Sequence, residues 1–193
     1  MNRDTGGFTL IEVVFAATIA VVILGAALGV MMQVQDTGSV LEMRAAARTE
    51  AQRALFAVSR ELGQASLASL GALPGASIRY RVAVDADGDG TALDGAGRVE
   101  WSEERIIQRD VDDANHDGIG AEQLVLLKGS EVTVLANGLA PDETPSGGAA
   151  KPGVWFESAP GGVRAAVRTQ RTSHPDQHVL VEELAETITV RNP

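Results

Sequence analysis

Two short acidic segments have the spacing of a calcium-binding loop. Each matches the first half of the pattern D-x-[DN]-x-[DN]-G, in which alternate side-chain oxygens converge on a hard cation and the glycine permits a sharp turn. Neither segment has the glutamate that usually closes such a loop at its twelfth position, so Asp94 or Glu122 would have to supply that ligand. The alternative is that Asp and Gly are simply favoured in surface turns. The candidate calcium ligands are Asp85, Asp87, Asp89, Asp113, Asn115 and Asp117. The sequence indicates no cofactor that the protein requires, and calcium is the possible one.

Other residue types that perform chemistry are sparse. His174 and His178 are four residues apart, but Pro175 between them disfavours a helix that would present both to zinc. There is no cysteine, no serine in a glycine-flanked nucleophile elbow and no histidine in a triad context. The sequence therefore predicts that the protein is not an enzyme.

An acidic residue stands at the threshold of a long apolar segment. Residues 13–35, which follow Glu12, carry no formal charge, and ~20 apolar residues in a helix are enough to span a bilayer. An acid entering lipid needs a cationic partner. Cleavage between Gly7 and Phe8 would create one, because the new amino group of Phe8 would lie close to Glu12 of the same or a neighbouring subunit. The alternative reading of Glu12 is an acid that snorkels to the membrane interface.

The same segment has two simpler interpretations. A secretory signal peptide has a basic n-region and an apolar stretch of roughly 7 to 15 residues, whereas this stretch is longer and only Arg3 precedes it as a base. A plain single-span anchor stays open on spacing alone.

The run Gly-Phe-Thr-Leu-Ile-Glu at residues 7–12, after a short polar leader and before an apolar helix, resembles type IV prepilins and type II secretion pseudopilins. The resemblance implies that a prepilin peptidase removes residues 1–7 and that Phe8 is then N-methylated. It also implies that Glu12 pairs with the N-terminal amine of an adjacent subunit during assembly. The precursor would be a single-pass inner-membrane protein with its head outside the cytoplasm, later part of a periplasmic or cell-surface filament.

The apolar helix is predicted to continue into an amphipathic segment. Apolar side chains recur every three or four residues, until Gly71 and Pro74 end the helical pattern. We expect one helix over residues 8–65. Its first part is a membrane or filament-core segment, residues 8–35, and its second part belongs to an amphipathic segment, residues 36–70. The expected buried face consists of Val40, Met43, Ala47, Ala51, Leu55, Val58, Leu62 and Ala65.

Residues 71–193 are predicted to form a β-rich head, which makes the fold class α+β. Alternating or β-branched stretches are separated by Asp-Gly, Asn-Gly and Gly-Gly pairs, and an antiparallel sheet packed on the helix is expected. Trp101, Trp155 and Phe156 are the expected core anchors, since aromatic residues make up only 4% of the chain. The predicted strands cover residues 77–84, 98–108, 123–127, 132–136, 154–157, 163–169 and 184–190.

Charge and size narrow the functional class. A net charge of -10 argues against nucleic-acid binding, which needs clustered Lys and Arg. Residues 53–65 (RALFAVSRELGQA), with the later strands IRYRV and RIIQRDV, resemble W-type minor pilins and minor pseudopilin J. That resemblance implies a pilin fold and other minor pilins as partners.

The sequence thus predicts a minor type IV pilin that primes or caps pilus assembly after cleavage by prepilin peptidase. The nearest alternative is a minor pseudopilin of a type II secretion system. An alternative of another class is a membrane-anchored calcium- or ligand-binding protein that does not polymerise.

Overall fold

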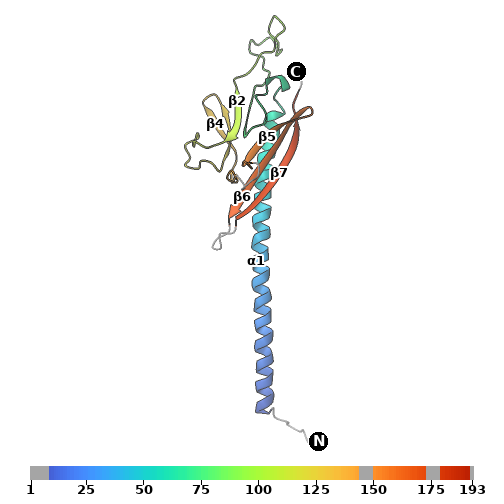
Figure 1. Ribbon diagram of the computed structural model, residues 1–193, viewed down its shortest axis with the longest axis vertical. Coiled ribbons are helices and arrows are strands. Elements are labelled where there is room, and N and C mark those ends of the chain that lie inside the picture. Colours follow the sequence, from blue (N-terminus) through green and yellow to red (C-terminus); the bar gives the residue numbers. More distant parts are fainter. Residues whose placement is uncertain (1–8, 144–149, 173–178, 192–193) are drawn as a thin grey trace. The chain divides into compact units, whose positions relative to one another are not determined.

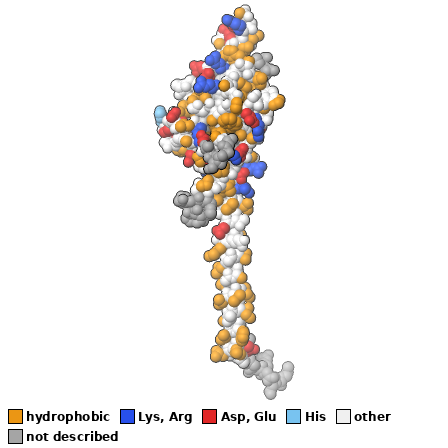
Figure 2. Space-filling view, in the orientation of Figure 1, with side chains coloured by type: hydrophobic (Ala, Val, Ile, Leu, Met, Phe, Trp, Pro, Cys, Tyr) orange, Lys and Arg blue, Asp and Glu red, His pale blue; other side chains and the backbone are white. Residues whose placement is uncertain are grey.

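A computed structural model describes residues 9–143, 150–172 and 179–191 of the chain (Figure 1). The chain divides into two compact units, residues 1–42 and 43–193. One helix, α1 (Leu10–Leu62), contributes to both units. In the first unit α1 is the whole of the described secondary structure, and its side chains from Leu10 to Thr37 are exposed. Figure 2 shows that on the visible face these side chains are mostly apolar.

The α-helix ends at Leu62, three residues before the predicted end. The N–H groups of Gln64 and Ala65 donate to the carbonyls three residues earlier, at 3.2 and 3.0 Å, so the last turn tightens. A short 3-10 helix, η1 (Leu67–Ser69), follows and is capped by the Ser66 side chain. Residues 63–70 are therefore not a continuation of the amphipathic α-helix.

The buried face of α1 lies in the second unit. The prediction holds from Ala47 onward, where Ala51, Leu55, Val58 and Leu62 are buried. Val40 is exposed and Met43 is half-buried. Alanines on this face let the β strands approach closely, and the Thr169 hydroxyl donates to the Ala47 backbone carbonyl at 2.7 Å.

The head contains two antiparallel sheets. The first has the order β1 (Ser77–Tyr80), β2 (Arg105–Arg109), β3 (Leu124–Lys128) and β4 (Glu131–Ala136). The second has the order β5 (Val154–Ala159), β6 (Gly162–Thr172) and β7 (Val179–Thr189). The expected single sheet is thus divided, although segments next to β1 and β4 bridge the second sheet. Gly75 and Phe156 exchange backbone hydrogen bonds of 2.9 and 2.8 Å, and Leu139 bridges Thr169.

All seven predicted strands exist, with different bounds. The strand predicted at residues 77–84 stops at Tyr80, and the one predicted at 98–108 begins at Arg105, because residues 82–101 form isolated bridges around an irregular loop. β6 and β7 are longer than predicted and pair along their whole length. Figure 1 shows these two strands beside α1, where the Thr169–Ala47 contact and an Arg44–Glu182 ion pair of 2.7 Å join them to the helix.

The core is aliphatic with two aromatic anchors. Tyr80 and Phe156 are fully buried between the sheets and the helix. The prediction that Trp101 and Trp155 are also core anchors is wrong, because both are half-buried. Trp155 neighbours Phe156 on β5, and successive side chains of a strand point to opposite faces.

Candidate functional site

The first turn of α1 is closed by a reciprocal contact between Thr9 and Glu12. The Glu12 Oε2 atom accepts hydrogen bonds from the Thr9 N–H at 2.9 Å and from the Thr9 hydroxyl at 3.0 Å. The Thr9 Oγ1 atom in turn accepts from the Glu12 N–H at 3.4 Å. This is a capping box, which satisfies N–H groups that have no partner inside the helix. Sequence reasoning did not identify it, although the T-x-x-E spacing was available as a signal.

The capping box leaves part of the Glu12 carboxylate free. Within the described residues Oε1 accepts no hydrogen bond, and the side chain is exposed. The carboxylate also lies at the positive end of the helix dipole. Glu12 can therefore cap its own helix through one oxygen and still present the other to a cation. The predicted cleavage site, Gly7 and Phe8, lies outside the described residues.

The apolar part of α1 has the dimensions of a membrane span. The helix is long and apolar enough to cross a bilayer, and none of its most apolar stretch is buried in the protein. This part of the helix could therefore anchor the chain in a membrane.

The first acidic loop folds around Asp85. Its carboxylate accepts from the N–H groups of Gly88 at 2.6 Å and Gly90 at 2.8 Å, and both glycines have left-handed φ angles, of 81° and 89°. Carboxylate oxygens of Asp85, Asp87 and Glu100 all lie within 4.8 Å of one another. Three acidic oxygens at this separation suit a hard divalent cation.

Glu100 is the third carboxylate of this cluster, and sequence reasoning did not identify it. It lies outside the loop motif and reaches the site because its carbonyl accepts from the Val84 N–H at 3.0 Å across an irregular hairpin. Its Oε2 atom also accepts from the Ala86 N–H at 2.6 Å. By contrast, Asp89 bonds to Thr91 at 2.8 Å, and Asp94, the predicted closing ligand, pairs with Arg98 at 2.8 Å.

Asp94 is held in its ionised form by these bonds. The Arg98 backbone N–H and then its guanidinium lower the pKa of the Asp94 carboxyl. Asp94 is thus in an ion pair with Arg98 and is not among the three carboxylates that converge, which are those of Asp85, Asp87 and Glu100.

The second acidic loop is arranged differently. The Asp117 Oδ2 atom accepts from the side-chain amides of Asn115 and Gln123, both at 2.9 Å, and these bonds, led by that from Gln123, lower the pKa of Asp117. Asp113 accepts from the Asp117 N–H at 3.0 Å. In the parts of the chain that the structure describes, three acidic groups converge only in the first loop. The predicted second loop is an internally bonded turn.

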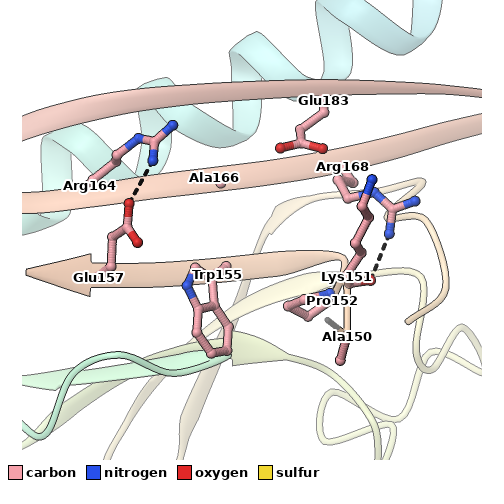
Figure 3. Close-up of a pocket in the computed structure, with 9 residues that line it drawn as sticks. All are labelled: Ala150, Lys151, Pro152, Trp155, Glu157, Arg164, Ala166, Arg168 and Glu183. Atoms are coloured by element: carbon pink, nitrogen blue, oxygen red, sulfur yellow. Dashed lines mark hydrogen bonds and ion pairs between the residues drawn. The ribbon is translucent and has the colours of Figure 1, made fainter. Parts of the chain in front are cut away.

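A shallow pocket of about 250 Å³ lies over β5 and β6 (Figure 3). Trp155 lines it, and its arginines are already engaged: Arg164 pairs with Glu157 at 2.6 Å, and Arg168 donates to the Lys151 carbonyl at 2.7 Å. None of the residues drawn in Figure 3 is a serine, threonine, cysteine or histidine.

A buried polar cluster lies where α1 ends. The Glu61 Oε2 atom accepts from the Tyr80 hydroxyl at 3.1 Å and from Arg105 at 3.2 Å. Burial, followed by the Glu61 charge, raises the pKa of Tyr80. The contacts tie the helix to β1 and β2, which is a structural role. His174 and His178, where zinc was disfavoured, lie outside the described residues.

Comparison with known proteins bears on the N-terminus. Residues 2–28 match the model of the prokaryotic N-terminal methylation motif. No curated protein and no solved structure matches the chain. The motif favours a structural protein over an enzyme, and implies processing by prepilin peptidase and assembly with other pilins. The N-terminus of the chain is therefore type IV prepilin-like, and it opens a long apolar helix that is followed by a β-sheet head.

Proposed function

We propose that the protein is a minor type IV pilin, cut between Gly7 and Phe8, N-methylated on Phe8, and built into a filament that it helps to initiate or cap. The observation that carries the proposal is the methylation motif at residues 2–28, which includes the start of a helix able to span a membrane. The minor rather than major role is supported by the resemblance of residues 53–65 to W-type minor pilins.

Glu12 would have two roles in this pathway. Its Oε2 atom caps α1 through Thr9, and its remaining oxygen would meet the amine of Phe8 on a neighbouring subunit. An amine drawn into an apolar filament core is costly unless it is paired. The charge of Glu12 would therefore matter for assembly, whereas the hydrogen bonds would matter for the start of the helix.

Intact-mass analysis of the mature chain from its native host tests the processing step. The expected product begins at Phe8 and carries one added methyl group. An intact Met1, or a cut elsewhere, would remove the assignment and leave the membrane-anchored, non-polymerising protein.

Three variants separate the roles at the first turn. Glu12→Gln keeps an acceptor for the Thr9 N–H but loses the charge, and Thr9→Ala loses the capping hydroxyl but keeps the charge. Glu12→Ala loses both the charge and the side-chain acceptor. We expect all three to be cleaved, Glu12→Gln and Glu12→Ala to be poorly incorporated, and Thr9→Ala to be incorporated nearly as well as wild type. Equal incorporation of Glu12→Gln and wild type would contradict the proposed amine contact.

Subunit counting and deletion separate the related alternatives. A minor pilin is expected at a small fraction of the main subunit in purified filaments, and its deletion should reduce piliation. Loss of secretion with normal piliation would instead identify a pseudopilin of a type II secretion system.

A calcium site in the first acidic loop is a second, separate proposal. It is supported by the convergence of Asp85, Asp87 and Glu100. Such an ion would join residues 85–90 to the opposite side of the hairpin and would stabilise the head.

A further inference from the structure

In the head unit, α1 separates its acids from its bases. The two acids from Met43 to Leu62 both face the head: the Glu50 carboxylate accepts from the Asn137 N–H at 3.0 Å, and Glu61 binds Tyr80 and Arg105. The arginines of the same segment are all exposed, although Arg44, near its start, pairs with Glu182 of β7. The outward side of this helix is therefore basic, although the chain as a whole carries a net charge of -10.

Four exposed residues form what we term the arginine strip: Arg48, Arg53, Phe56 and Arg60. Arg48, Phe56 and Arg60 are spaced by multiples of four along one ridge of the helix, and Arg53 lies three residues before Phe56. At 1.5 Å per residue the strip is ~18 Å long. Within the described residues Arg48 and Arg53 make no ion pair, and Arg60 has only a 3.8 Å contact with Glu61, which is already shared with Arg105.

Phe56 lies in the middle of the strip and is 71% exposed. An aromatic side chain flanked by arginines is the composition that protein interfaces favour, because the ring supplies apolar contact and the guanidinium groups supply directed charge. A membrane surface fits less well, since an interfacial helix needs a wide apolar face. Here the apolar face of the helix is already buried in the head, which leaves Phe56 as the one large apolar side chain of the strip.

We propose that the arginine strip docks an acidic loop on the head of a neighbouring pilin-type subunit. We choose an acidic partner because of charge complementarity. The three arginines of the strip have no strong ion pair within the described residues and would bind carboxylates. Heads of this kind can supply them, since the sequence after Leu62 carries nearly twice as many acidic as basic side chains, many in exposed loops such as residues 85–94. The inference rests on the proposed function, because it requires subunits held side by side in a filament.

Photo-crosslinking in the native host tests the contact on the full chain. A benzophenone analogue of phenylalanine replaces Phe56, and the control places the same analogue at Val111, which is 68% exposed elsewhere on the head. We expect position 56 to link to a second protein that carries an N-terminal methylation motif, at a peptide that contains Asp or Glu. Links to lipid, links to a segment without acids, or a yield no higher than that from position 111 would overturn the proposal.

Charge reversal provides the second measurement. Arg48→Glu with Arg53→Glu should lower the crosslinking yield from position 56 at least about tenfold, because like charges would then face each other. The matched control, Arg81→Glu with Arg171→Glu, reverses two other exposed arginines and should leave the yield unchanged. Equal yields in the two double variants would refute the role of the strip, and unchanged melting of both variants would show that the head remains folded.

The same samples distinguish this proposal from the proposed function. A chain that is not cut before Phe8 and not found in filaments contradicts the pilin assignment. A chain that is cut and incorporated, but gives no crosslink above the control, contradicts only the docking surface.

Discussion

Replacement of Glu61, on the last turn of α1, by alanine should destabilise the head. The substitution removes the acceptor of two hydrogen bonds, from Tyr80 at 3.1 Å and from Arg105 at 3.2 Å. The side chains of Glu61 and Arg105 are only 11% and 15% exposed. Arg105 would then be a charge held near the core without its partner. Its Nε atom already has no hydrogen-bond partner among the described residues.

The expected magnitude follows from these contacts. Removal of one partner of a buried ion pair costs about 3–5 kcal/mol. The lower end applies here, because a cavity of about 240 Å³ beside Glu61 and Arg105 can admit water to the stranded guanidinium. A loss of about 3 kcal/mol corresponds to a fall of roughly 6–12 °C in the melting temperature of a unit of this size.

Tryptophan emission during heating of the detergent-solubilised full chain measures this effect. Both tryptophans of the chain, Trp101 and Trp155, lie in the head unit, so the signal reports its unfolding. Glu61→Gln is the matched control, because it keeps the shape and an acceptor for Tyr80, and it should melt between wild type and Glu61→Ala.

A double-mutant cycle with Arg105→Met isolates the pair. If the cost of Glu61→Ala comes mainly from the stranded arginine, the double variant should be more stable than the sum of the single effects by about 1–3 kcal/mol. Additive effects, or a Glu61→Ala melting temperature within about 2 °C of wild type, would refute the reasoning.

Three further predictions use the same melting assay. The native head raises the pKa of Tyr80, so the folded protein binds the hydroxyl proton of Tyr80 more tightly than the unfolded chain does. The free energy of unfolding should therefore be constant through neutral pH and fall above the ordinary tyrosine pKa of about 10. The Tyr80→Phe variant should not show this fall. If the first loop binds calcium, a chelator should lower the melting temperature, since an ion at 100 times its Kd contributes about 2.7 kcal/mol. Glu100→Gln should abolish this response to the chelator, and Asp113→Asn should not. A wild-type melting curve that the chelator leaves unchanged would mean that the loop is a surface turn that binds no calcium. Gly162→Ala should lower the melting temperature more than Gly95→Ala, because a Cβ at Gly162 would collide with the Ile188 carbonyl while one at Gly95 meets nothing. Equal melting of the two variants would contradict that packing.

The α+β class and the number of strands were predictable because their signals are local. Alternation of apolar residues and Gly-containing turns identified all seven strands, and the three-to-four spacing identified the buried face of α1 from Ala47 onward. The division into two sheets was not predictable, because it depends on which segments pair. Contacts such as the bridge between Gly75 and Phe156 join residues far apart in sequence. The start of β7 was missed since Glu182 and Glu183 suggested solvent, yet an edge strand accepts charged residues readily.

In the candidate site too, features formed by contiguous residues could be predicted and features formed by distant residues could not. The methylation motif is contiguous, so the run from Gly7 to Glu12 was sufficient to predict it. The acidic cluster is not contiguous. Its third carboxylate, Glu100, belongs to another segment and approaches Asp85 only because the chain reverses between them. Motif spacing could therefore suggest the loop but could not supply the closing residue.

Three glutamates of α1 illustrate why residue type alone does not assign a role. Glu12 caps the helix through Thr9, Glu50 accepts the N–H of Asn137 just after β4, and Glu61 balances Arg105 at the helix end. Replacement by glutamine distinguishes them, because it keeps a hydrogen-bond acceptor and removes the charge. The change at position 50 should be nearly silent, since its partner is a neutral amide. The change at position 61 should lower stability, and under the proposed function the change at position 12 should lower assembly while the head remains as stable as in wild type. A Glu12→Gln variant with a less stable head would show that the two units of the chain are energetically coupled, and that the assembly defect cannot be assigned to the amine contact alone.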